Sequence, residues 1–542
     1  MKKHVPLILI IFFAIFLRFW QIETVPPSMY WDEVSQGYNA YSILQTGRDE
    51  HQESFPIIRF QAFGDYKAPV YIYLDVPFIA LFGKTTLAVR FPSALFGSMT
   101  VLLTYFLVCE LFYSHKNKKM LGLLTSFLLA ISPWHMQLSR GAYEANIATF
   151  FTVLGIVLFF LGKRTKNWLL ILSVISFVFS FYAFNAHRIF IPLFTIFLGI
   201  LYWRELLISR RKVICSCIMG FTLLLPFLFY LRSPESKLRF NEVNIFSDIS
   251  VIKESNKLIA QEGSTKISQI INNRRVLFGL LYMHHYFDFF NPSYLFFSGD
   301  VNPRFSLRDN GELFLWELPF LIIGGYLLFK ERSRPAFVIL GWFVLAPIAA
   351  ATARETPHAL RSETYLPTFQ IISAFGMVWG FEKINALHTL IKKMIILLCY
   401  TIIIISLYLF LHDYFVHFPR TFSYDWQYGY KQAVEEAEKL KNKYDYIAFT
   451  DGYGRPYIYV LFYTNTLPSE YWRQSIVSRD MFGFYNVSKV GKYVFRKQLV
   501  DPSDNGKKVL YIGRVEDIPN SFKKIRTINF LDGNPAFVIA ER

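Results

Sequence analysis

The feature that most constrains the fold of this 542-residue chain is a series of long apolar runs. Clear examples are residues 5–20, 151–161, 213–231 and 394–411. Runs of about 17 to 25 apolar residues match the hydrocarbon thickness of a bilayer. Charged residues make up only 18% of the chain, against about 25% in an ordinary soluble domain. The sequence therefore predicts an integral membrane protein.

The apolar runs predict a polytopic α-helical protein with about eleven membrane-spanning helices. We expect them at residues 5–20, 88–113, 120–132, 143–162, 168–185, 189–203, 213–231, 313–330, 335–353, 364–381 and 394–412. The span at 120–132 is short. A further apolar stretch at 70–82 is expected to lie along the membrane interface or to re-enter the membrane.

Lys and Arg in the short loops predict the orientation, because loops rich in these residues stay on the cytoplasmic side. Alternate loops are rich in them, as at 116–119, 210–212 and 392–393. The amino terminus is therefore expected inside the cell, and an odd number of spans puts the carboxyl terminus outside. These loops also explain the net charge of +17. No basic segment is interleaved with aromatic residues on a soluble part, so nucleic acid is not expected as a partner.

Three longer segments are then expected on the outer side, at 21–87, 232–312 and 413–542. We divide the chain into a transmembrane domain, 1–412, which carries the first two segments as outer loops, and an extracytoplasmic α/β domain, 413–542. In the second domain the pattern predicts a charged amphipathic helix at 430–443 and strands at 446–450, 457–463, 509–512 and 536–540. The chain has four cysteines, all in or beside predicted spans, so no disulfide framework is expected outside.

Polar residues gather on the predicted outer side. Asp32 and Glu33 follow the first span closely, and acids near a hydrocarbon boundary are costly unless they are paired or used. Asp32 is also expected to cap a helix at 33–45, which is compatible with catalysis. Lys67 lies later in the same loop, and Arg140 and Glu144 lie at the outer mouth of the third and fourth spans.

This set of residues suits the transfer of a sugar from a lipid phosphate. Cations can hold the phosphate, and a carboxylate can deprotonate an incoming hydroxyl. The departing phosphate is a good leaving group, so the reaction needs no second carboxyl as general acid, unlike glycoside hydrolysis. Attack from the side opposite the phosphate inverts the anomeric centre.

The ordered motifs of the chain resemble those of the GT-C glycosyltransferases. More narrowly, they are similar to the protein O-mannosyltransferase and aminoarabinose-lipid A transferase superfamily, over about residues 1 to 420. The motifs are Trp31-Asp32-Glu33, the Gly-Asp-Tyr-Lys-Ala-Pro turn at 64–69, Arg90-Phe91-Pro92-Ser93 and the segment 139–144. The segments 296–304 and 357–361 are also similar to bacterial members of uncharacterised acceptor.

The resemblance implies a polyprenyl-phosphate-sugar donor, an inverting transfer and a catalytic aspartate in the first outer loop. Asp32 takes that role, with Glu33 as its motif neighbour. Lys67 matches a lysine that contacts the donor phosphate, although Ala68 departs from the family's pattern. Glu144 stands where relatives often have a second acid, usually Asp.

Beyond the family motifs we add Arg140, His358 and Arg361 as contacts to phosphate or acceptor, with structural pairing as the alternative for each. The expected partners are the lipid-linked donor, a protein or envelope glycan or lipid as acceptor, and the surrounding membrane lipids. The expected donor sugar is a hexose, with a pentose as the alternative. The requirement for a metal or other cofactor is left open. His284, His285 and Asp288 could ligate a metal, but adjacent histidines on a helix point about 100° apart, which favours hydrogen bonding.

Two other functions are compatible with this composition. A transporter or flippase of lipid-linked sugars would place ionisable residues and broken helices at mid-membrane. The predicted spans keep their charges at the ends, which favours chemistry at the interface. A non-catalytic envelope glycan-binding membrane protein would use the tail as its binding module and would leave Asp32 dispensable.

Overall fold

The computed structural model describes residues 4–63, 65–165, 168–233, 236, 244–479 and 485–542. Gly64 of the predicted turn, and parts of the predicted outer segments 232–312 and 413–542, lie outside these ranges. The chain forms two compact units. The helical unit consists of Met1–Arg18, Phe96–Ser139 and Glu144–Tyr408, and the sheet unit of Phe19–Leu95, Arg140–Tyr143 and Leu409–Arg542. The sheet unit is larger than the predicted 413–542 domain because the first outer loop packs within it.

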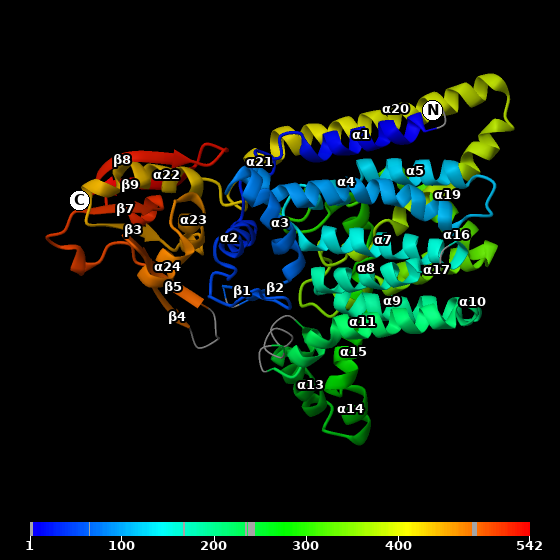
Figure 1. Ribbon diagram of the computed structural model, residues 1–542, viewed down its shortest axis with the longest axis horizontal. Coiled ribbons are helices and arrows are strands. Elements are labelled where there is room, and N and C mark those ends of the chain that lie inside the picture. Colours follow the sequence, from blue (N-terminus) through cyan, green and yellow to red (C-terminus); the bar gives the residue numbers. More distant parts are fainter. Residues whose placement is uncertain (1–3, 64, 166–167, 234–235, 237–243, 480–484) are drawn as a thin grey trace. The chain divides into compact units, whose positions relative to one another are not determined.

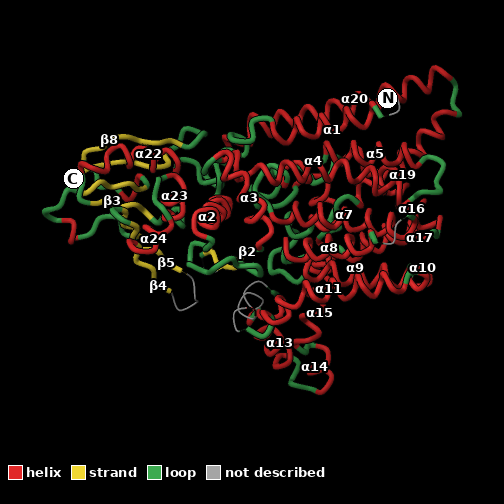
Figure 2. The backbone as a smooth tube through the Cα atoms, in the orientation of Figure 1, coloured by secondary structure: helices red, strands yellow, loops and turns green. Residues whose placement is uncertain are grey.

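The helical unit is a bundle in which α7, α8 and α9 pack in sequence order (Figure 1). Figure 2 shows the same three segments as helices along the backbone tube. Three of its helices, α1, α4 and α20, have residues in the sheet unit as well. The helices are α1 (Val5–Phe19), α4 (Thr86–Leu111), α5 (Lys118–Ile131), α6 (Pro133–Leu138), α7 (Glu144–Arg164), α8 (Leu169–Ala183), α9 (His187–Leu201), α10 (Trp203–Ile208), α11 (Arg210–Tyr230), α13 (Ile249–Gln261), α14 (Lys266–Ile271), α15 (Arg274–Asp288), α16 (Leu318–Glu331), α17 (Arg334–Leu345), α18 (Pro347–Ala350), α19 (Thr368–Asn385) and α20 (Thr389–His412).

Several of these helices are suited to a membrane. Within the described ranges, four helical segments are long and apolar enough to cross one: Thr86–Leu111, Glu144–Arg164, Arg210–Tyr230 and Thr389–Thr421. Shorter apolar helices accompany them, among them α1, α8 and α9. The last long segment leaves most of its apolar surface uncovered, as lipid-facing helices do. The helical class agrees with the sequence analysis, and the count of eleven spans stays a prediction.

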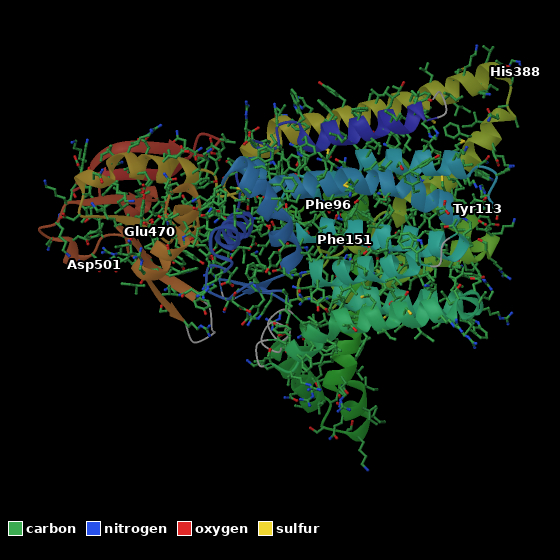
Figure 3. All side chains as sticks on the ribbon, viewed as in Figure 1. Phe96, Tyr113, Phe151, His388, Glu470 and Asp501 are labelled. Atoms are coloured by element: carbon green, nitrogen blue, oxygen red, sulfur yellow. The ribbon has the colours of Figure 1, made fainter. Side chains whose placement is uncertain are left out.

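Aromatic side chains and glycines fill the interior of the helical unit. Phe96 and Phe151, labelled in Figure 3, lie in neighbouring helices with ring centroids 6.0 Å apart. Helices α16 and α19 cross so closely that a Cβ added at Gly324 would overlap the carbonyl of Ile372. A Cβ at Gly376 would overlap the carbonyl of Phe320 in the same way. Small residues permit such close backbone approach, which supplies packing energy between helices in lipid.

The sheet unit contains a mixed seven-stranded sheet among its described residues, in the order β4-β5-β6-β3-β7-β9-β8. The central strands β6, β3 and β7 are parallel, and the outer pairs are antiparallel. The strands are β3 (Tyr446–Thr450), β4 (Ser475–Arg479), β5 (Tyr485–Val490), β6 (Tyr493–Arg496), β7 (Val509–Gly513), β8 (Lys523–Asn529) and β9 (Pro535–Glu541). Helices α22 (Tyr430–Leu440), α23 (Pro456–Tyr463) and α24 (Pro468–Gln474) accompany them.

The predicted strand at 457–463 is wrong, because these residues form helix α23. A short apolar run does not distinguish a buried strand from a buried helix by periodicity. Pro456 at the first helical position sets the backbone for a helix. The predicted helix at 430–443 and the strands at 446–450, 509–512 and 536–540 agree with the structure to within a few residues.

The first outer loop contributes α2 (Trp31–Thr46), the hairpin β1 (Phe60–Ala62) and β2 (Asp65–Lys67), and α3 (Pro69–Phe82) to the sheet unit. Asp32 lies inside the first turn of α2, and Tyr30 occupies the capping position, so the expectation that Asp32 caps this helix is wrong. The loop and the tail are joined through Gln427, whose Oε1 accepts from the Trp31 N–H at 3.0 Å and from the Tyr459 hydroxyl at 2.7 Å.

The adjacent glycines of α16 allow the close helix crossing to be tested. Gly324→Ala should destabilise the protein by about 1–3 kcal/mol, because the added methyl group overlaps backbone atoms that cannot yield. Gly325→Ala is the control, since its Cβ would meet only Ile372 Cγ2 at 3.9 Å. Thermal unfolding of the purified proteins measures both changes. Equal melting temperatures for the two variants would contradict the packing described here.

Candidate active site

A buried ion pair stands at the start of α2. The Glu33 carboxylate accepts from Arg90 Nε and from Arg90 Nη2, each at 2.9 Å, and both side chains are fully buried. Glu33 also accepts the backbone N–H groups of Tyr30 at 3.3 Å and Ala142 at 2.9 Å. Four donors therefore satisfy this carboxylate, which compensates for its removal from water.

Two arginines hold the segment that leads from the first apolar helix to α2. Arg90 donates to the carbonyls of Ile22, Pro26 and Ser28 at 2.6 to 2.9 Å. Arg140 donates to the carbonyls of Trp20 and Val25 at 2.7 Å each. The guanidinium of Arg140 is buried, and burial lowers its pKa. These bonds fix the backbone that precedes Asp32.

Aromatic rings from the tail cover both guanidinium groups. The Trp426 ring lies 5.6 Å from the guanidinium carbon of Arg90. The Tyr414 and Phe415 rings lie 5.4 and 5.0 Å from that of Arg140. Cations over aromatic faces are attracted to the ring quadrupole. The tail thus helps to position the polar residues of the first loop.

Asp32 differs from its neighbour Glu33 in its surroundings. Successive helical residues point about 100° apart, and the Asp32 side chain stays 34% exposed while that of Glu33 is buried. The Asp32 carboxylate accepts from Lys67 Nζ at 2.6 Å. Lys67 ends β2 opposite Phe60 in the hairpin, and its side chain is 8% exposed. An accessible carboxylate thus lies beside a shielded ammonium group.

A second polar cluster lies in the helical unit, around Asp300. Its carboxylate accepts the backbone N–H groups of Ala359 at 2.7 Å and Asn302 at 2.9 Å, and it lies 3.5 Å from His358 Nδ1. Burial raises the pKa of Asp300 to about 6, and burial together with the nearby Arg361 lowers the pKa of His358. His358 is therefore neutral at physiological pH.

The remaining predicted residues lie in the helical unit too. Arg361 is partly exposed and donates to the Glu355 carbonyl at 3.4 Å. Glu144 opens α7 and is half-buried. The structure therefore gathers Asp32, Glu33, Lys67 and Arg140 in the sheet unit, and His358 and Arg361 around Asp300 in the helical unit.

Two residues of these clusters were not selected from the sequence. Arg90 opens the 90–93 motif, and Asp300 lies within the 296–304 segment. Both segments were noted for their resemblance to a family. A charged residue inside such a segment is the sequence feature that could have identified Arg90 and Asp300. As for metals, the described residues bring together His284, His285 and Asp288 in α15.

Comparison with known proteins agrees with this architecture. The model of the dolichyl-phosphate-mannose-protein mannosyltransferase family matches residues 8–233. No curated protein matches the sequence.

Among solved structures, ArnT from Cupriavidus metallidurans in the apo state has a TM-score of 0.53 and 10% sequence identity, over 100% of this chain and 98% of that chain. Its structure bound to undecaprenyl phosphate gives the same TM-score and identity, over 99% and 98%. The archaeal oligosaccharyltransferase AglB from Archaeoglobus fulgidus, in complex with an inhibitory peptide and a dolichol-phosphate, has a TM-score of 0.51 and 15% identity, over 85% of this chain and 64% of that chain.

The protein therefore shares the fold of ArnT and AglB, with a helical unit and a sheet unit. Residues 8–233 match the model of the mannosyltransferase family named above. The resemblance inferred from the motifs is confirmed. The family model and the fold together support a membrane glycosyltransferase of the GT-C type.

The two adjacent acids should differ in what they contribute to stability. Glu33→Ala leaves Arg90 buried without its carboxylate, which should cost about 3–5 kcal/mol. Asp32→Ala breaks a partly exposed pair and should cost about 1 kcal/mol or less. Thermal unfolding in detergent measures both, and a larger loss in the Asp32 variant would contradict the assignment of Glu33 to the structural pair.

Proposed function

We propose that this protein transfers a sugar from a polyprenyl-phosphate-linked donor to a hydroxyl group of an extracytoplasmic acceptor, with inversion at the anomeric carbon. The observation that carries the proposal is the Asp32–Lys67 pair, an accessible carboxylate 2.6 Å from an ammonium group in the loop that follows the first apolar helix. A base and a phosphate-binding cation are the two groups that this reaction requires.

In the proposed step the acceptor oxygen attacks the anomeric carbon from the side opposite the phosphate. The new carbon–oxygen bond forms as the bond between the anomeric carbon and the phosphate oxygen breaks, and its electron pair leaves with the polyprenyl phosphate. Asp32 takes the proton of the acceptor hydroxyl as general base. It later releases this proton to water.

Lys67 would neutralise the charge that develops on the departing phosphate. In the structure its ammonium group pairs with Asp32. A donor phosphate that competes for Lys67 would leave the Asp32 carboxylate free to accept a proton. Donor binding would thereby prepare the base, because one cation serves the two anions in turn.

Glu33 has a positioning role in this proposal. Its four hydrogen bonds leave it little capacity for a proton, whereas they anchor the first turn of α2, which carries Asp32. Arg90 and Arg140 complete the anchor through the carbonyl groups of the preceding segment. Rigid support of this kind keeps a base within reach of its proton.

For the helical unit we propose that His358 and Arg361 contact the phosphate or the acceptor, and that Glu144 serves as the second acid of the family. A neutral histidine can either donate or accept a hydrogen bond to a hydroxyl-rich ligand. A partly exposed guanidinium can bind a phosphate with two N–H groups. We further propose that the amino terminus is cytoplasmic and that the sheet domain lies outside.

The relatives support the substrate class. ArnT was solved with undecaprenyl phosphate, and AglB with a dolichol-phosphate and a peptide. A polyprenyl phosphate is the lipid carrier that the proposed reaction releases, and the peptide in the AglB structure is an inhibitor. The family name adds a mannosyl donor and a protein acceptor as the first pair to assay.

Asp32→Asn should abolish transfer of labelled sugar from a polyprenyl-phosphate donor in isolated membranes, with a loss of at least about 100-fold, because the amide cannot take the proton. Glu53→Gln is the control, since this exposed acid of the same loop pairs with Arg59 on the surface. Scintillation counting of the acceptor fraction gives the rate. Full activity of Asp32→Asn would refute the proposed base and favour a transporter or a binding protein.

Lys67→Ala should raise the KM for the donor and lower kcat/KM, because the cation binds the phosphate in both the ground state and the transition state. Lys431→Ala is the control, as this lysine of α22 is exposed. A titration with donor at saturating acceptor separates KM from kcat. An unchanged KM would show that Lys67 does not contact the donor.

A further inference from the structure

A group of three metal-ligating side chains lies on α15, outside the residues used above. The ligand atoms of His284, His285 and Asp288 all lie within 4.8 Å of one another. On a helical wheel Asp288 falls between the two histidines, about 40° from His284 and about 60° from His285. The acid one turn later thus lies between the two diverging histidines, so the three side chains can face one ion.

Two hydrogen bonds to residues outside the group orient these side chains for a cation. His285 Nδ1 lies 2.9 Å from the Ala353 carbonyl, and since a carbonyl only accepts, the proton sits on Nδ1. That tautomer leaves a lone pair on Nε2. The Asp288 carboxylate accepts from the Thr356 hydroxyl at 2.7 Å. Metal-binding histidines and carboxylates are oriented by partners of this kind.

The helix that carries the group is itself fixed. Tyr282 donates from its hydroxyl to the Ile348 carbonyl at 3.1 Å, and Tyr286 donates to the Val344 carbonyl at 2.9 Å. His285 is only 9% exposed, whereas the side chain of His284 is 75% exposed. The group therefore has one rigid, shielded side and one side open to solvent, as an entry path for an ion requires.

We propose that His284, His285 and Asp288 bind a divalent transition-metal ion, with Zn²⁺ as the preferred ion. Imidazole and carboxylate ligands suit Zn²⁺, and three protein ligands leave a fourth position for water. The ion would hold His285 and Asp288 in place, and these side chains bond to Ala353 and Thr356 in the segment that leads to His358 and Arg361. Its role in that arrangement is to order this segment, and it is independent of the proposed sugar transfer.

The test uses the full chain, purified in detergent with a tag that contains no histidine and treated with a chelator. Calorimetry with Zn²⁺ alone should give one site per chain, and Co²⁺ should give the visible absorption of a coordinated ion. His284→Ala should weaken Zn²⁺ binding at least about tenfold, and Thr356→Val about 10- to 100-fold through the lost support of Asp288.

His388→Ala is the matched control, since this exposed histidine precedes α20 (Figure 3) and should leave binding unchanged. His284 is exposed, so its removal should leave the melting temperature of the metal-free protein unchanged, which separates loss of a ligand from loss of fold. Absence of Zn²⁺ binding by the unaltered protein would overturn the proposal. Equal affinities in the His284, Thr356 and His388 variants would overturn it as well.

Discussion

The buried pair between Glu33 and Arg90 fixes the start of α2 and the backbone that precedes it. Two full charges are removed from water there, and this is tolerable because four donors satisfy the carboxylate and backbone carbonyls satisfy the guanidinium. The pair connects the first turn of α2 with the start of α4 and, through Ala142, with the segment before α7. Three distant parts of the sequence meet at one carboxylate.

This constraint explains why adjacent acids have different environments. The Glu33 carboxylate is buried and makes all its hydrogen bonds within the fold. Asp32 remains accessible because its side chain points about 100° away from that of Glu33 on the helix. The Trp-Asp-Glu motif thus places an accessible acid and a fully buried one at adjacent positions.

Much of the fold could be predicted from the sequence. The helical membrane class followed from the lengths of the apolar runs, and strands such as Tyr446–Thr450 followed from apolar residues between turn residues. The helix Pro456–Tyr463 was missed because a continuous apolar run fits either conformation. Asp32, Lys67 and Arg140 were selected as polar residues near the membrane exit, but Arg90 and Asp300 were not. Their importance depends on partners far away in sequence, which a local pattern does not reveal.

The hydrogen bonds of Gln427 to Trp31 and Tyr459 limit how the sequences of the first loop and the tail can change during evolution. The first loop contacts Arg90 and Ala142, and it also contacts the tail through Gln427. The tail therefore cannot be exchanged as a separate module. A chain that acquired a different tail would lose the support of α2 unless the loop changed with it. Relatives that differ in the tail are therefore expected to differ in the first loop as well.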